Sequence, residues 1–216
     1  MTILFDLDGT LIDSTEAILE SFHRSYEILG GENPSDAAIK ALIGHTLEDM
    51  YLQLGRAPET VETYVRTYKE HYRIISKQKT VLLPRAREAI EAAASFATLG
   101  IVTTKTGLYS RELLEHFGVM GLFGVLIGRE DVTHAKPHPE PVLKALQQLS
   151  AEPARSWLIG DTRLDAGSAL QAGIGCVGVL SGYDNAEQLR ALTPFIEKDA
   201  LEAVRFIADK GRNVTF

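Results

Sequence analysis

Near the start of the chain, two aspartates separated by one residue follow a short apolar run, in Ile3-Leu4-Phe5-Asp6-Leu7-Asp8-Gly9-Thr10. The run predicts a buried strand, whose C-terminal end is where open α/β sheets bind their ligands. Gly9 permits a tight turn there and a close approach of the backbone to a ligand. Two carboxylates this close repel each other and need a cation, a shared proton or both. A strand followed by an acidic turn is the plainer interpretation; the alternative is a chemical site at Asp6 and Asp8.

Three further groups of polar residues follow predicted strands. Thr103 and Thr104 come after Leu99-Gly100-Ile101-Val102, and Asp161 ends another apolar run, with Asp165 four residues later. Lys136 precedes Pro137 and Pro139, which stiffen the loop before a predicted helix. Phosphoryl transfer needs such an inventory: a nucleophile, a proton donor, a metal site and cations for the phosphoryl oxygens.

Strand-like and helix-like segments alternate after about residue 80, which is typical of a parallel sheet with crossover helices. The expected strands cover residues 3–5, 96–103, 125–128, 156–161 and 176–179, with a last one near 195–196. The expected helices cover residues 86–94, 110–117, 139–149, 165–172 and 200–210, with a short one from 186. The fold class is therefore α/β, with a doubly wound, Rossmann-like parallel-sheet core.

Residues 14–80 break this alternation. They contain no convincing strand, and their apolar residues recur at helical spacing, as at Ile18, Phe22, Tyr26 and Leu29. A helical segment this long exceeds a crossover and predicts an inserted bundle. We therefore expect a core domain of residues 1–13 and 81–216 and a helical domain of residues 14–80.

Composition limits the classes of function. The net charge of −7 argues against nucleic-acid binding, and no apolar run approaches the roughly twenty residues that a membrane span needs. The single cysteine, Cys176, excludes an internal disulfide and reads as a small core residue. The N-terminus lacks a basic region, so we expect no signal peptide and a cytoplasmic protein. No apolar surface stripe stands out, which favours a monomer and leaves a homodimer open.

The segment Asp6-Leu7-Asp8-Gly9-Thr10-Leu11 resembles the first motif of the haloacid dehalogenase (HAD) superfamily, most of whose members are magnesium-dependent phosphatases. The resemblance implies that Asp6 is a nucleophile that forms an aspartyl-phosphate. It implies that Asp8 is the general acid and base. Dehalogenating and phosphonate-cleaving members lack the second aspartate, so Asp8 favours a phosphatase or phosphotransferase.

The other motifs of the superfamily follow in the same order. Thr103 resembles the second, a hydroxyl that donates to a phosphoryl oxygen, and Lys136 in Lys-Pro-x-Pro resembles the third, a cation beside the nucleophile and the phosphoryl group. Gly160-Asp161 with Asp165 resembles the fourth. Mg²⁺ keeps waters and needs few protein oxygens. The resemblance gives it the carboxylates of Asp6 and Asp161, the backbone carbonyl of Asp8, and Asp165 as a direct or indirect helper.

The nearest resemblance is to the phosphoglycolate-phosphatase-like subgroup, in which the residue 14–80 segment is a cap domain placed after the first motif. Its cap loop resembles Ile43-Gly44-His45-Thr46-Leu47. The expected substrate-binding residues are Gly9, Thr10, Gly44, His45, Thr104 and Lys105. Close members often have Asn or Ser where this chain has Thr104, so an Asn contact to substrate is lost.

The expected function is Mg²⁺-dependent hydrolysis of a small phosphorylated metabolite, similar to phosphoglycolate. A sugar phosphomutase or an inorganic pyrophosphatase would share the four motifs and stays open. So does a non-catalytic binding or regulatory protein on the same fold, although the intact Asp6, Asp8, Lys136 and Asp161 argue against it.

Overall fold

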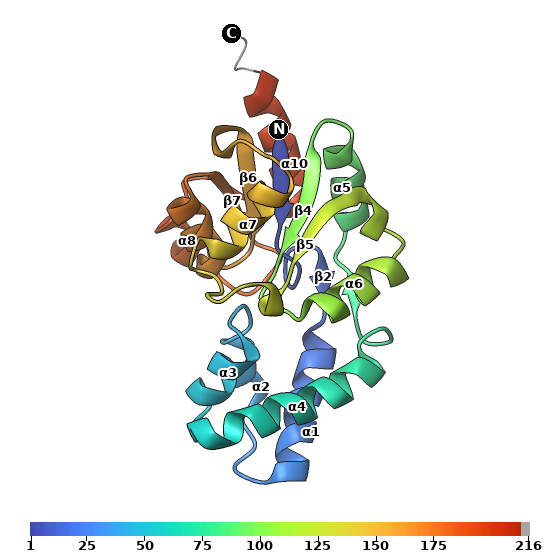
Figure 1. Cartoon of the computed structure of the whole chain (residues 1–216), viewed down its shortest axis with the longest axis vertical. Coiled ribbons are helices and arrows are strands. Elements are labelled where there is room, and N and C mark those ends of the chain that lie inside the picture. Colours follow the sequence, from blue (N-terminus) through green and yellow to red (C-terminus); the bar gives the residue numbers. More distant parts are fainter. Residues whose placement is uncertain (213–216) are drawn as a thin grey trace.

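The computed structural model describes residues 1–212. A parallel sheet lies between the helices of its larger part (Figure 1). The sheet has the strand order β5-β4-β1-β6-β7-β8, and every neighbouring pair is parallel. Its strands are β1 (Thr2–Phe5), β4 (Thr98–Val102), β5 (Phe123–Ile127), β6 (Ser156–Gly160), β7 (Gly175–Val179) and β8 (Ile196–Glu197).

Helices cover both faces of this sheet, which confirms the doubly wound α/β fold class. One face packs against α5 (Ala86–Ala94), α6 (Gly107–His116) and α10 (Ala200–Arg212). The other packs against α7 (Glu140–Gln148) and α8 (Arg163–Ala172). The remaining elements of the core are α9 (Ala186–Arg190) and three short 3₁₀ turns, η1 (Met120–Leu122), η2 (Arg129–Asp131) and η3 (Pro153–Arg155).

Strand β1 shows why a continuous apolar run in the sequence predicted a buried strand that ends at Asp6. Ile3 and Phe5 pack into the core on one face of the sheet, and Leu4 packs into the core on the other. A parallel strand covered on both faces is a continuous apolar run rather than an alternating one. The chain can therefore change to carboxylates only where the strand ends, at Asp6.

Most expected elements agree with the structure to within a few residues. Helix α6 is the clearest shift, because it begins at Gly107 rather than Ser110. The carboxylate of Glu130 accepts a hydrogen bond of 2.9 Å from the Gly107 amide. A carboxylate at a helix N-terminus satisfies a free amide and stabilises the first turn.

Between residues 14 and 80, all of which the structure describes, the regular elements are helices; we call this segment the helical block. It contains α1 (Thr15–Leu29), α2 (Asp36–Lys40), α3 (Leu47–Gln53) and α4 (Pro58–Ile75). Its own core is aromatic: Phe22 packs on Tyr51 and Tyr68 at ring distances of 4.7 and 5.0 Å. The block lies at the end of the core where β1 and β4 terminate (Figure 1).

Two strands too short for the sequence to reveal join the helical block to the core. Strand β2 (Ile12–Asp13) pairs antiparallel with β3 (Val81–Leu82), so the chain enters and leaves the block along one ribbon. In the described part of the chain, no helix is both long enough and apolar enough to cross a bilayer.

Candidate active site

Asp6 and Lys136 form a buried ion pair at the C-terminal edge of the sheet. Asp6 continues β1, since its amide donates to the Ile159 carbonyl at 2.9 Å. The Lys136 ammonium donates to Asp6 Oδ1 at 2.7 Å and to the Val102 carbonyl at 3.1 Å. Burial raises the pKa of Asp6 to about 7, although Lys136 opposes the rise. Burial opposes the charge on Lys136, but Asp165 and Asp6 raise its pKa above the ordinary lysine value.

Asp161 follows β6 and is fully buried. Thr10 Oγ1 donates to its Oδ1 at 2.9 Å, and the Tyr183 amide donates to its Oδ2 at 2.9 Å. Burial, and after it the charges of Asp6 and Asp165, raise the pKa of Asp161 well above the ordinary value. The Thr10 hydroxyl therefore holds Asp161; the substrate contact expected for Thr10 stays a prediction.

Glycines let the backbone approach this carboxylate closely. Gly9 has a φ of +85°, and a Cβ at Gly9 would lie 2.4 Å from Asp161 Oδ2. A Cβ at Gly182 would lie within 1.9 Å of the same oxygen. Gly9 thus makes room for Asp161 and gives its carbonyl to the Ser181 hydroxyl at 2.8 Å. The Gly9 amide donates to the Ile12 carbonyl at 2.8 Å. The substrate contact expected for Gly9 stays a prediction.

Asp165 has both carboxylate oxygens engaged. Its Oδ1 accepts from Lys136 Nζ at 2.5 Å. Its Oδ2 accepts from the Thr162 amide at 3.0 Å and hydroxyl at 2.6 Å, which completes a capping box at the start of α8. Asp165 therefore positions Lys136 and caps the N-terminus of α8. Its expected role toward the metal stays a prediction.

The residues present fit a divalent cation. Carboxylate oxygens of the buried Asp6, Asp161 and Asp165 all lie within 4.8 Å of one another. The Lys136 ammonium pairs with two of these carboxylates, those of Asp6 and Asp165. One positive charge among three carboxylates leaves an excess of negative charge away from water, which is costly without a cation or a proton. Carboxylate oxygens in this number are the ligands that Mg²⁺ prefers.

Asp8 faces the helical block and has partners that the sequence did not reveal. The Ser14 hydroxyl donates to its Oδ1, and Lys105 Nζ lies 2.9 Å from its Oδ2. The Lys105 ammonium in turn lies 4.6 Å from the centre of the Tyr72 ring on α4. Burial opposes the charge on Lys105, but Asp8 and Tyr72 raise its pKa. Lys105 thus lies between the core carboxylate and the helical block.

The two threonines after β4 have different surroundings. Thr103 is buried just after β4 ends, and its Oγ1 accepts from the Lys105 amide at 3.2 Å. The Thr104 hydroxyl donates to the Gly44 carbonyl of the helical block at 2.9 Å. This contact joins the block to the core; the substrate contact expected for Thr104 stays a prediction.

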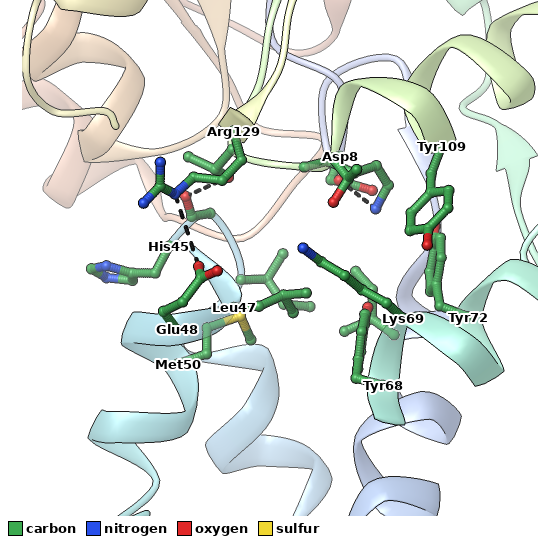
Figure 2. A pocket seen from close by; sticks show the side chains of 16 residues that line it. Asp8, His45, Leu47, Glu48, Met50, Tyr68, Lys69, Tyr72, Tyr109 and Arg129 are labelled. Carbon is green, nitrogen blue, oxygen red and sulfur yellow. Dashed lines mark hydrogen bonds and ion pairs between the residues drawn. The ribbon is translucent and has the colours of Figure 1, made fainter. Parts of the chain in front are cut away.

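The loop at Gly44 and His45 lies against the core. Gly44 has a φ of +108°, and a Cβ there would lie 3.1 Å from Thr162 Cγ2. His45 is half-buried at the rim of the pocket between block and core, with its ring directed away from Asp8 in the view of Figure 2. The substrate contacts expected from these residues stay predictions.

This pocket lies between the helical block and the core and is partly open to solvent. Asp8, Thr104, Lys105 and Arg129 border it from the core, and α1, α3, α4 and the Gly44 loop border it from the block (Figure 2). Asp8 therefore borders a space whose walls come from both the core and the helical block.

Comparison with known families settles the membership of the chain. The sequence pattern of haloacid dehalogenase-like hydrolases matches residues 3–179. The chain belongs to this hydrolase family. The resemblance drawn from the four motifs is thereby confirmed.

Several known relatives are similar to this hydrolase over nearly its whole length. A protein of Dickeya dadantii named "Probable phosphatase IndB" is 32% identical over 94% of this chain and 90% of its own length. Pyrophosphatase PpaX of Oceanobacillus iheyensis is 31% identical over 96% and 97%. Phosphoglycolate phosphatase of Salmonella typhimurium is 29% identical over 92% and 88%. A solved haloacid dehalogenase-like hydrolase from Bacteroides fragilis superimposes with a TM-score of 0.89 at 32% identity, covering 94% of this chain and 98% of that one.

The structure of the hydrolase brings Asp6, Asp161 and Asp165 together with Lys136. Asp6, Thr103 and Asp161 directly follow strands of the sheet, as predicted, whereas Lys136 lies on the loop between β5 and α7. Sequence reasoning assigned no role in the site to Ser14, Tyr72 and Tyr183. Tyr183 had a usable signal, because it follows β7 and the ends of parallel strands meet at one edge. Ser14 and Tyr72 had none, since their contacts depend on how the helical block sits on the core.

Proposed function

We propose that this hydrolase is a Mg²⁺-dependent phosphatase that cleaves small phosphomonoesters through an aspartyl-phosphate on Asp6. The supporting observation is the state of that carboxylate. Lys136 holds Oδ1, whereas Oδ2 has no hydrogen-bond partner among the residues that the structure describes. A buried carboxylate with one oxygen fixed and the other open is oriented for attack.

The reaction then divides into two displacements. In the first, Asp6 Oδ2 attacks phosphorus and the ester P–O bond breaks, while Asp8 gives a proton to the departing alkoxide. In the second, Asp8 takes a proton from water, and this water attacks the phosphorus of the acyl phosphate to release inorganic phosphate and regenerate Asp6. Lys136 lies beside Asp6, where it can donate to the phosphoryl oxygens, and we expect the Thr103 hydroxyl to donate to them as well.

A metal would complete this arrangement. Asp6, Asp161 and the backbone carbonyl of Asp8 would hold Mg²⁺, with Asp165 as a direct or indirect helper. When bound, the ion would supply positive charge to the phosphoryl oxygens. Thr10 and Tyr183 keep the Asp161 carboxylate in place for this purpose.

We further propose that residues 14–80 form a cap domain on a core of residues 1–13 and 81–216, and that the cap recognises the rest of the substrate. A phosphorylated metabolite such as phosphoglycolate would meet Lys105, Gly44 and His45 at the boundary. We expect a cytoplasmic monomer with no nucleic-acid or membrane partner.

Pyrophosphate hydrolysis is a second candidate function. Relatives named Pyrophosphatase PpaX, from Oceanobacillus iheyensis and Anoxybacillus flavithermus, are 31% and 33% identical to this chain. Pyrophosphate offers the same phosphoryl group to Asp6 and differs only in the group that leaves.

The test measures phosphate release from p-nitrophenyl phosphate, phosphoglycolate and pyrophosphate, with Mg²⁺ and with EDTA. Asp6→Asn should abolish turnover of all three, as should EDTA. Asp36→Asn, an exposed carboxylate on α2, is the matched control and should keep full activity. A phosphorylated peptide containing Asp6 after rapid acid quench would support the intermediate. Retained turnover in purified Asp6→Asn protein would overturn the assignment.

A further inference from the structure

The cavity between the helical block and the core is mainly apolar beyond Asp8. Its walls carry carbon from both sides: Ile18, Leu47, Met50 and Tyr68 from the block, and Tyr109 from α6 of the core. A ligand that consists of phosphate alone would leave these apolar walls exposed to water. The walls therefore favour a leaving group with a carbon body.

Three cationic side chains border the same cavity, and two of them are already paired. Lys105 pairs with Asp8 at 2.9 Å. Arg129 of η2 faces Glu48 of α3 at 3.8 Å (Figure 2). Lys69 of α4 has no hydrogen bond or ion pair with any other residue in the described part of the chain, and it is half-buried. A half-buried ammonium without a partner is a ready site for an anion.

Lys69 points into the cavity from the wall opposite Asp8 (Figure 2). The two carboxylates that share this cavity, Asp8 and Glu48, each face another cation. An anionic group entering from the substrate would therefore find Lys69 unoccupied.

We propose that Lys69 binds a second anionic group on the leaving portion of the substrate, at the end of a carbon body that lies against the apolar walls. This inference rests on the proposed phosphatase function and narrows its substrate class. The substrate class is thus an anionic organic phosphomonoester rather than inorganic pyrophosphate, which has no carbon to place there.

The experiment uses pairs of substrates that differ in charge alone. Each pair is an aliphatic phosphomonoester with a terminal carboxylate and its carboxamide, with two to five carbons, assayed in the full-length enzyme with Mg²⁺. The quantity measured is the ratio of kcat/KM for the carboxylate to that for the carboxamide. The variant is Lys69→Met, and Lys40→Met, an exposed lysine of α2, is the matched control.

We expect the wild type and Lys40→Met to prefer the carboxylate by at least about tenfold in the best pair, as a charge-assisted hydrogen bond contributes. In Lys69→Met the ratio should fall close to one, through a higher KM for the carboxylate. An equal ratio in wild type and Lys69→Met, or no carboxylate preference in wild type, overturns the inference. Absence of turnover for every ester including p-nitrophenyl phosphate would instead overturn the phosphatase function.

Discussion

Replacement of Gly9 by alanine tests how the backbone turn supports the site. The Cβ would lie 2.4 Å from Asp161 Oδ2 and 2.7 Å from its Cγ, and the φ of +85° is one that L-residues rarely adopt. Asp161 is fully buried, and its two carboxylate oxygens accept from the Thr10 hydroxyl and the Tyr183 amide. The carboxylate must therefore move and give up at least one of its hydrogen bonds.

The cost has two parts. The positive φ costs an alanine about 1–2 kcal/mol, and the loss of a hydrogen bond to a charged group costs about 1.5–3 kcal/mol. Gly9→Ala should therefore lower the free energy of unfolding by about 2.5–5 kcal/mol. The control is Gly173→Ala at the C-terminus of α8, where φ is +70° and no atom lies within 4 Å of the added Cβ. Gly173→Ala should therefore lose only the free energy of unfolding that the positive φ costs, about 1–2 kcal/mol.

Urea unfolding with and without Mg²⁺ measures both the fold and the metal site. The ion stabilises a protein that binds it in the native state. The midpoints of wild type and Gly173→Ala should rise with Mg²⁺, whereas that of Gly9→Ala should not, and its activity should be lost. If Gly9→Ala and Gly173→Ala are equally destabilised and respond equally to Mg²⁺, then Gly9 does not make room for Asp161 and the reasoning is wrong.

Two further predictions concern the buried charges. Lys136→Met leaves Asp6 and Asp165 without their cation, so metal-free protein should lose about 3–5 kcal/mol of unfolding free energy at pH 8; a loss below about 1 kcal/mol in urea unfolding would contradict the buried pair. Burial raises the pKa of Asp6 from 3.8 to about 7 in the fold, so its contribution to stability is complete below about pH 4 and is lost as the pH rises through about 7. Urea midpoints in EDTA should therefore fall between pH 5 and pH 8, less steeply in Asp6→Asn, and a rise in both proteins would refute this sign.

The sequence was a good guide to the core and to one half of the site. Asp6, Thr103 and Asp161 directly follow apolar runs, and such runs in a parallel sheet end at one common edge. Knowledge of the strands was therefore enough to bring these side chains together. Lys136 lies on the loop between β5 and α7, where its prolines marked it in the sequence. The helix N-terminus at Arg163 was missed by two residues, because the capping box of Thr162 and Asp165 lies outside the apolar periodicity.

The other half of the site depends on contacts between the helical block and the core. The sequence gives no distance between Lys105 and Tyr72, or between Thr104 and the Gly44 carbonyl, because each pair joins segments with separate hydrophobic cores. Periodicity identifies the apolar face of a helix but does not say where a polar residue beside that face will point. For this reason Lys69 did not stand out among the charged residues of α4.

The ribbon of β2 and β3 has a consequence for how this enzyme could have changed over time. Asp13 pairs directly with Val81, so the two ends of the intervening chain are already neighbours. A segment inserted between adjacent points adds only a slowly growing loop entropy to the host fold, and host folds tolerate such insertions well. Helices there can be lengthened, replaced or exchanged between relatives while the sheet edge and its aspartates stay as they are. The β2–β3 ribbon is thus an insertion point, where a new substrate-recognition segment can be added while the catalytic residues of the core stay unchanged.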